Sequence, residues 1–284
     1  MTRVDKSAAL VLGVAVLATI VVPMASQADP LGIGDVVATR LLPPLTRDTH
    51  GNLHLLGTDG FGRDLFTRMM LAGRLSLAIG LAGAVLAVLL GSVVGALAAW
   101  RAGTVDVIMM GVTDAMLSVP RLVLLLLCAA LWRPGGTMVV MILVGTGWMS
   151  VARLVRGEVL GVKQRQFVEA AHALGAPSMR VLLRHVLPNA IGPAIVALTL
   201  GVGNAILLES GLSFLGLGVQ PPQPSWGNMI AGGRDVIVIA PWVAIAPGLA
   251  LIATVVACTL LGDAARDRLA GEQLATGRAL GERG

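Results

Sequence analysis

The chain has 284 residues, of which 56% are hydrophobic and 13% are charged, and its mean hydropathy is +0.84. An average soluble domain has about 25% charged residues, so this composition excludes a disordered chain and argues against a soluble globular domain. The net charge is +5, and aromatic residues make up only 3% of the chain. The basic excess is therefore better explained by membrane topology than by binding to nucleic acid. The two cysteines, Cys128 and Cys258, lie inside apolar runs, which excludes a disulfide framework or a cysteine metal cluster.

Six apolar stretches are long enough to span a membrane, which takes about 20 residues. They are Ala8–Met24, Leu75–Trp100, Val105–Trp132, Thr137–Val151 with an extension to Val155 left open, Ile191–Leu208 and Pro241–Leu261. These runs are continuous rather than alternating, so they predict helices and not barrel strands. We therefore expect an all-α, polytopic membrane protein with six transmembrane helices.

The first stretch has two interpretations. Arg3 and Lys6 precede it and Ser26-Gln27-Ala28 follows it, which is also the pattern of a cleaved signal peptide. We favour a retained anchor.

The basic residues predict the orientation of the chain. With the N-terminus inside, thirteen basic residues lie on the inner side and seven on the outer side, so both termini are expected in the cytoplasm. This orientation divides the chain into an N-terminal anchor (1–27), an extracytoplasmic segment (28–74), a core with five further spans (75–270) and a cytoplasmic tail (271–284). Turn-forming residues in the extracytoplasmic segment indicate a small folded cap. Within the core, residues 153–188 form a basic cytoplasmic loop.

An apolar stripe marks a short helix in this loop. Phe167, Ala170, Ala171 and Leu174 are spaced as on one helix face, and Gly175 supplies a helix stop. A second helical piece is expected from Ser178 to Leu187, ended by Pro188, with Asn189 capping the fifth span. Two interpretations of this elbow stay open: an amphipathic element resting on lipid headgroups, or a docking element for a soluble partner.

The loop also resembles a known family. Glu169-Ala170-Ala171, then Gly175, then Leu187-Pro188 match in spacing the EAA loop of ABC-importer permeases, although His185 stands where that pattern has Ile. Residues 57–68, 209–230 and 262–267 resemble further segments of the dipeptide/oligopeptide/nickel permeases, C-type subunit. One departure is Cys258-Thr259, where that family usually has an Asn.

The resemblance implies a type I ABC-importer permease fold in the bacterial inner membrane and the import of di- or oligopeptides. It implies as partners a second homologous permease, two ATPase subunits and an extracytoplasmic binding protein, with ATP and Mg bound by the ATPases and no cofactor in this chain. Together with the stripe, it assigns contact with the ATPase to Phe167, Glu169, Ala170, Ala171, Leu174, Gly175, Leu187 and Pro188.

Other functions have weaker support. The chain has no G-x-x-x-x-G-K-[ST] motif and no catalytic constellation, so we expect a transport subunit and not an enzyme. Within the family, import of nickel or a metal chelate is the competing function. An ion-coupled carrier or pore that works without an ATPase is the alternative from another class. His50 and His54 are spaced like a weak metal site, but we expect no metal there.

Charged residues at membrane depth cost about 2.5–3.5 kcal/mol each on insertion scales, so they should face other helices or a water-filled path. Asp114, Arg121 and Glu209 are candidates for the translocation path; the alternative is that they pair with neighbouring helices. Asp114 and Arg121 are seven residues apart, which on one straight helix is about 10 Å, so each needs another partner. Gly91 and Gly95 have the spacing of a close helix contact, although chance explains the pair equally well.

Overall fold

The computed structural model describes residues 3–25, 36–49 and 51–281, with side chains over 6–24, 36–49 and 51–268. The peptidase-site candidate Ser26-Gln27-Ala28 and His50 of the histidine pair lie outside these residues.

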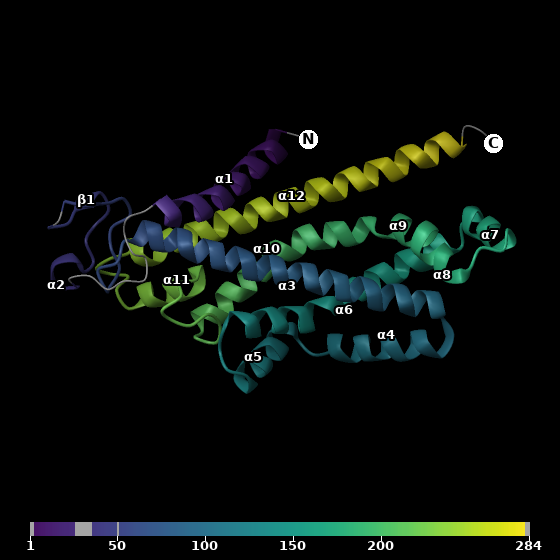
Figure 1. Cartoon of the computed structure of the whole chain (residues 1–284), viewed down its shortest axis with the longest axis horizontal. Helices are drawn as coiled ribbons and strands as arrows, with labels where there is room; N and C mark the ends of the chain where they lie inside the picture. The colour runs from purple at the N-terminus through teal and green to yellow at the C-terminus, as the bar shows by residue number, and fades with distance from the viewer. Residues whose placement is uncertain (1–2, 26–35, 50, 282–284) are drawn as a thin grey trace. The chain divides into compact units, whose positions relative to one another are not determined.

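The described chain is mostly helical (Figure 1). Its helices are α1 (Arg3–Ala25), α2 (Val36–Thr39), α3 (Leu65–Arg101), α4 (Gly103–Leu117), α5 (Arg121–Leu131), α6 (Gly136–Lys163), α7 (Gln166–Ala173), α8 (Ser178–Val181), the π-helix η1 (Leu182–Val186), α9 (Leu187–Ala190), α10 (Gly192–Phe214), α11 (Trp226–Arg234) and α12 (Trp242–Gly281). Two short strands, β1 (Thr46–Arg47) and β2 (Leu53–His54), pair antiparallel. Five of the described helices, α1, α3, α6, α10 and α12, are long and apolar enough to cross a membrane.

The expected third span, Val105–Trp132, is not one helix. It is broken into α4 and α5, which meet at an angle of 86°, and counting this pair as one span gives up to six. The break falls at Pro120, because proline has no backbone N–H and disfavours helical geometry in the residue before it. The sequence-based placement of Asp114 and Arg121 on one straight helix is therefore wrong.

The helices also extend beyond the predicted apolar stretches. The α3 helix begins at Leu65 and not at Leu75, and α6 continues to Lys163, so that it includes the first eleven residues (153–163) of the expected cytoplasmic loop. Hydropathy locates the part of a helix in hydrocarbon, whereas the backbone stays helical until a cap or a glycine ends it.

The chain divides into two compact units, which are Met1–Gly83, Leu126–Ile142 and Gly203–Cys258, and Ala84–Leu125, Leu143–Val202 and Thr259–Gly284. In the first unit, α11 is anchored by the fully buried Trp226, whose Nε1 donates to the Met69 carbonyl oxygen at 3.1 Å. Gly73 leaves room for this indole, because a Cβ there would come within 2.7 Å of the ring.

The second unit has a core of small and β-branched side chains contributed by α3, α6 and the segment from α7 to α10. Its members are Ala96, Ala99, Val151, Val155, Val159, Val162, Val168, Val181, Leu182, Val186, Ala190 and Ala194. Small side chains let helix backbones approach closely, as is common between membrane helices. Gly91 and Gly95 make such an approach. A Cβ at Gly91 would lie 2.5 Å from the Trp148 carbonyl oxygen, and a Cβ at Gly95 would overlap the Ala152 carbonyl oxygen.

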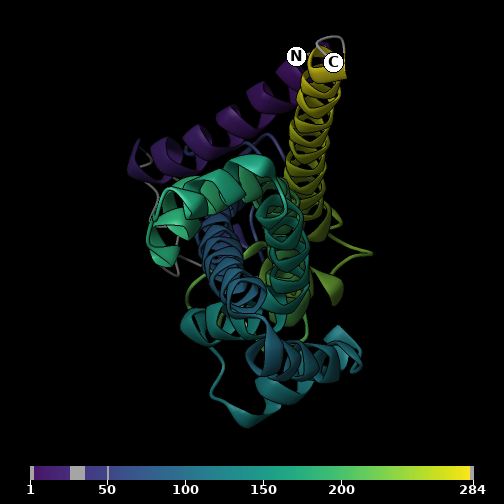
Figure 2. The same cartoon turned by 90° about the vertical axis from the view of Figure 1, so that its right-hand side faces the viewer.

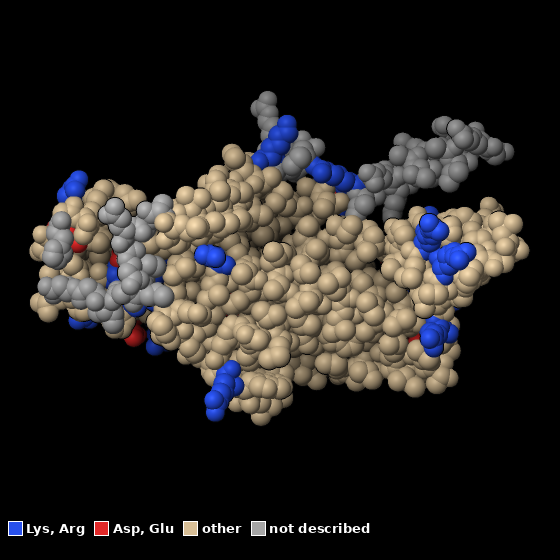
Figure 3. All heavy atoms as spheres, in the orientation of Figure 1, with Lys and Arg blue, Asp and Glu red and all other residues tan. Residues whose placement is uncertain are grey.

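The described surface fits a membrane environment. Figure 3 shows a face on which most atoms belong to residues that are neither acidic nor basic. Large apolar side chains are exposed along the spans, among them Leu17 of α1, Leu89 of α3 and Leu249 of α12. Exposed apolar side chains on long helices are expected where lipid or a partner subunit covers them.

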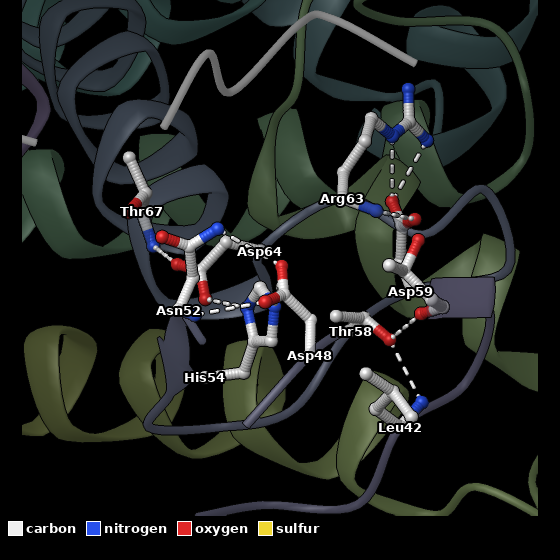
Figure 4. Close-up of polar contacts among 10 residues, drawn as sticks. Leu42, Asp48, Asn52, His54, Thr58, Asp59, Arg63, Asp64 and Thr67 are labelled. Atoms are coloured by element: carbon white, nitrogen blue, oxygen red, sulfur yellow. Dashed lines mark hydrogen bonds and ion pairs between the residues drawn. The ribbon is translucent and has the colours of Figure 1, made fainter. Parts of the chain in front are cut away.

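The expected cap is folded around the β1–β2 hairpin, which contrasts with the otherwise helical fold (Figure 4). His54 of β2 lies between two carboxylates, with Nδ1 2.8 Å from Asp64 Oδ1 and Nε2 3.6 Å from Asp48 Oδ2. The second oxygen of Asp64 accepts a hydrogen bond from the Thr67 backbone N–H at 2.8 Å, which caps the start of α3. The cap is thereby fixed to the end of a membrane helix.

A second polar cluster in the cap is built on Asp59 (Figure 4). One oxygen of its carboxylate accepts the backbone N–H groups of Phe61 and Arg63, and the other accepts Arg63 Nε at 2.8 Å. The Arg63 guanidinium also lies over the Phe61 ring, 4.5 Å from its centroid. These residues line a cavity of about 480 Å³ in the first unit.

Candidate functional site

The elbow predicted in the cytoplasmic loop is present in the second unit and lies at one end of α3 and α6 (Figures 1 and 2). The helix α7 stops at Gly175, which adopts the left-handed conformation at a φ of +81°. The Gly175 N–H donates to the His172 carbonyl at 2.9 Å, and the Ala176 N–H donates to that of Ala171 at 3.1 Å. This pair of bonds is the Schellman motif, which requires a glycine at that position. The helix stop predicted from the sequence is confirmed.

The apolar stripe of α7 faces outward. Leu174 is 88% exposed and Phe167 is 40% exposed, while Ala170 is exposed and Ala171 is only half-buried. The residue that anchors α7 is instead Val168, which is 1% exposed and belongs to the core of the second unit. The stripe is therefore a largely exposed apolar surface, on a helix that Val168 and the edge residue Ala171 fix to this core.

Glu169 lies off the stripe but is also exposed, and no hydrogen bond or ion pair holds its carboxylate among the described residues. An exposed carboxylate beside small alanine side chains can be reached by a basic or amide group of another protein. Glu169, Ala170 and Leu174 are thus each accessible to a partner.

The end of α3 is tied to this elbow by Trp100, which the sequence marked only as the end of an apolar stretch. Its indole stacks on His172 of α7, with ring centroids 6.1 Å apart, and its Nε1 donates to the Ser178 hydroxyl of α8 at 3.0 Å. Lys163 Nζ lies 5.3 Å from the centroid of the same ring. No sequence signal links these residues, because Trp100 and His172 are 72 positions apart.

The second helical piece differs from the expected one. It does not end at Pro188. The helix widens into η1 over Leu182–Val186 and then continues through Pro188 as α9 to Ala190. A proline ring clashes with the carbonyl four residues earlier, and a π-turn directly before the proline opens the helix at that point. Leu187, half-buried, packs against the core of the second unit.

The expected cap on the fifth span is also wrong. Asn189 does not cap α10: its side-chain amide donates back to the His185 carbonyl oxygen at 2.7 Å.

Two ion pairs join α4 to α6. Arg156 binds Asp106 through Nε and Nη2, both at 2.6 Å, and the carboxylate is 16% exposed. Arg153 and Asp114 form a longer pair of 3.7 Å, with both side chains about 60% exposed. Asp114 therefore has a neighbouring-helix partner, and its place in a translocation path stays a prediction.

Glu209 is fully buried in α10 and engaged within the first unit. Its carboxylate accepts hydrogen bonds from Ser213 Oγ at 2.7 Å and from Ser210 Oγ at 3.3 Å. The Ser213 hydroxyl in turn accepts the Val219 N–H, so the carboxylate holds the loop after α10. The structure gives Glu209 a packing role; its part in translocation stays a prediction.

Arg121 begins α5 directly after the break. Its guanidinium lies beside Gly147 of α6, and its buried Nε has no hydrogen-bond partner among the described residues.

Comparison with known proteins relates these features to a family. Residues 87–271 match the model of the binding-protein-dependent transport system inner membrane component. A Brucella suis protein that carries the name of a peptide transport system permease is 38% identical over 92% of this chain and 85% of its own length. The glutathione transport permease GsiD of Pectobacterium atrosepticum is 39% identical, over 76% of this chain and 72% of its own. The dipeptide transport permease DppC of Alkalihalophilus pseudofirmus is 36% identical, over 76% of this chain and 71% of its own length.

A solved structure shares the fold. The MetNI methionine ABC transporter matches with a TM-score of 0.56 at 18% identity, over 68% of this chain and 92% of the matched chain. The likeness supports the predicted type I importer fold.

Proposed function

Because the chain belongs to the family of inner membrane components of binding-protein-dependent transport systems, we propose that it imports di- and oligopeptides and that the segment from Gln166 to Pro188 couples it to a separate ATPase. Permeases of this family are subunits of ABC importers in the inner membrane. The proposal concerns the cargo, the partners and the coupling surface of this particular chain.

One observation carries the coupling proposal: most of the apolar stripe of α7 is exposed, while Val168 of the same helix is buried in the core of the second unit. Leu174 is the most exposed large apolar residue of the segment at 88%, whereas Val168 is 1% exposed. A rigid helix with an apolar, alanine-lined face suits a groove in another protein. Movement of that partner would be transmitted through the core behind Val168 to α3 and α6.

The names of the relatives support a peptide cargo. The Brucella protein, GsiD and DppC are named for transport of peptide, glutathione and dipeptide respectively. Their matches cover 92%, 76% and 76% of this chain. The competing cargo is nickel or a metal chelate. All four histidines of the chain lie outside the apolar stretches, so a path for the free metal ion would lack its commonest nitrogen ligand.

The proposed assembly contains a second homologous permease, two ATPase subunits that bind ATP and Mg, and an extracytoplasmic binding protein that delivers the peptide. Both termini and the α7 elbow face the cytoplasm in this arrangement, and the cap faces outward. Closure of the ATPase pair on ATP would open the path outward, and hydrolysis would return it inward.

The coupling proposal is tested with Leu174→Glu in the full complex reconstituted in liposomes. A charge on the exposed stripe should leave pairing with the second permease intact, reduce co-purification of the ATPase about tenfold or more and abolish ATP-driven uptake of a labelled dipeptide. The matched control is Leu53→Glu, on β2 of the cap, 46% exposed and outside the proposed coupling segment, which should retain the ATPase.

If the Leu174 variant retains the ATPase and its elbow instead loses contact with the lipid headgroups, the alternative in which the elbow rests on the membrane surface would be favoured. Uptake of the dipeptide by liposomes that contain the permeases without any ATPase would favour the carrier or pore. Uptake of nickel without uptake of peptide would overturn the cargo.

A further inference from the structure

Arg121 is a half-buried cation in a membrane segment. It is the first residue of α5, and its guanidinium lies against α6 where Gly147 leaves space. A Cβ at position 147 would be 3.4 Å from Arg121 Nη2 and 3.0 Å from the Cβ of Ala87. Arg121 Nε is buried, and no group among the described residues accepts its hydrogen. A buried donor without an acceptor is rare in folded proteins and calls for an explanation.

The acidic residues of the same broken span are already paired. Asp106 is held by Arg156 through two short hydrogen bonds, and Asp114 lies beside Arg153. Among the residues that the structure describes, Arg121 forms no ion pair. Because a charge at membrane depth is costly unless it is compensated, the anion that compensates Arg121 is expected from outside the part of the chain that the structure describes.

The backbone at this point adds positive potential. The first intrahelical bonds of α5 run from the amides of Val123 and Leu124 to the Pro120 carbonyl, so the amides of Arg121 and Leu122 precede them. Free amides in the first turn of a helix favour an anion, and a cation there is disfavoured. The guanidinium and the helix start therefore favour the same kind of ligand.

The depth of the site selects among anions. Arg121 lies between two apolar helices of one broken span, Gly103–Leu117 and Arg121–Leu131, and not at the end of a span. Lipid phosphates are expected at span ends, in the interfacial region. A carboxylate matches the two parallel donors of a guanidinium, and the molecule that brings one through the membrane interior is the cargo itself.

We propose that Arg121 binds the C-terminal carboxylate of a peptide as it passes through the permease. This inference rests on the proposed peptide cargo and goes beyond it, because it names the group of the peptide that is recognised and the residue that recognises it. Gly147 belongs to the same site, since it provides the space in which the guanidinium lies.

The test compares one dipeptide in two forms, with a free C-terminal carboxylate and with a C-terminal amide, in the reconstituted complex with its binding protein. In Arg121→Met, uptake of the free acid should fall about tenfold relative to the parent complex, while uptake of the amide should change less than about twofold. Arg121→Lys keeps the charge but lacks the planar guanidinium, so its uptake of the free acid should lie between that of the parent complex and that of Arg121→Met. Comparison with the parent complex for each peptide cancels any preference of the binding protein.

An amide that the binding protein does not deliver would give no uptake in the parent, so binding of both peptides to the complex without binding protein is measured as well. Arg121→Met should then weaken binding of the free acid alone. The matched control is Arg133→Met, an exposed arginine just after the other end of α5, which should change neither peptide.

Equal effects of Arg121→Met on acid and amide, in uptake and in binding, would overturn the inference. Loss of the second permease on purification would overturn it too, and would assign the missing anion to that partner. If the parent complex transports neither form of the peptide, the proposed cargo itself is wrong.

Discussion

The indole of Trp100 and the imidazole of His172 are stacked, with their centroids 6.1 Å apart and their planes inclined by 21°. Trp100 is near the end of the membrane helix α3, and His172 is in the last turn of α7. A flat aromatic contact between these two helices couples any displacement of α7 directly to α3. The hydrogen bond from Trp100 Nε1 to Ser178 adds α8 to the same connection.

Trp100→Leu should therefore uncouple ATP hydrolysis from transport. Loss of the stacked pair, worth about 0.5–1.5 kcal/mol, and of one hydrogen bond, worth about 1 kcal/mol, leaves α7 attached through Val168 but no longer rigidly tied to α3. We expect the peptides imported per ATP hydrolysed to fall several-fold. Uptake and phosphate release measured in the same proteoliposomes give this ratio.

Two variants separate the parts of this connection. Trp100→Phe keeps a ring over His172 and Ser178→Ala removes only the hydrogen-bond acceptor, so each should have about half the effect on the ratio. A Trp100→Leu complex with an unchanged ratio would show that the core behind α7 transmits the movement without the stack.

How far the sequence predicts this site depends on whether each feature is local. The stop at Gly175 was predictable, because a glycine after an apolar stripe determines the backbone by its own conformational freedom. The exposure of Leu174 was not, since the sequence identifies a stripe but not which side of the helix the rest of the fold covers. Val168, the residue that is covered, lies outside the stripe altogether.

The fold shows the same division. Hydropathy locates the six apolar stretches, but the run Val105–Trp132 is apolar on both sides of Pro120 and so hides the 86° bend. The ion pair between Asp106 and Arg156 connects residues 50 positions apart, which one sequence cannot reveal. An acidic residue in an apolar stretch signals only that a partner exists.

Gly95→Val should prevent close packing of α3 on α6. A Cβ at Gly95 would overlap the Ala152 carbonyl oxygen and come within 3.0 Å of the Arg156 backbone nitrogen, neither of which can move away as a side chain can. Overpacking of this kind costs about 1–3 kcal/mol, so the midpoint of thermal unfolding in detergent should fall clearly. Gly157→Val on α6 is the control, because a Cβ at Gly157 meets no atom within 4 Å. Equal unfolding midpoints for the two variants would mean that the close approach is unimportant for stability.

Asp64→Ala should loosen the cap from α3. The carboxylate accepts the Thr67 N–H and contacts His54 Nδ1, both at 2.8 Å, and loss of a helix N-cap costs about 0.5–2 kcal/mol. We expect faster proteolysis of the cap in the intact complex, and Asp64→Asn should restore part of the protection, because its side-chain oxygen still accepts from Thr67. Asp235→Ala removes an exposed carboxylate whose ion pair among the described residues is with its neighbour Arg234, and should leave the cap as resistant as in the parent. Unchanged proteolysis in Asp64→Ala would show that the β1–β2 hairpin holds the cap without this contact.

The two ion pairs between α4 and α6 should differ in strength although they join the same helices. Asp106 binds Arg156 through two bonds of 2.6 Å at low exposure, so Asp106→Asn should destabilise the second unit by about 2 kcal/mol. Asp114→Asn removes a 3.7 Å pair that is about 60% exposed, and should cost less than about 1 kcal/mol. Thermal unfolding of both variants in the same detergent measures the difference, and the exchanged pair Asp106→Arg with Arg156→Asp should recover part of the loss. If the two single variants unfold at the same temperature, then burial and bidentate geometry do not decide the strength of these pairs.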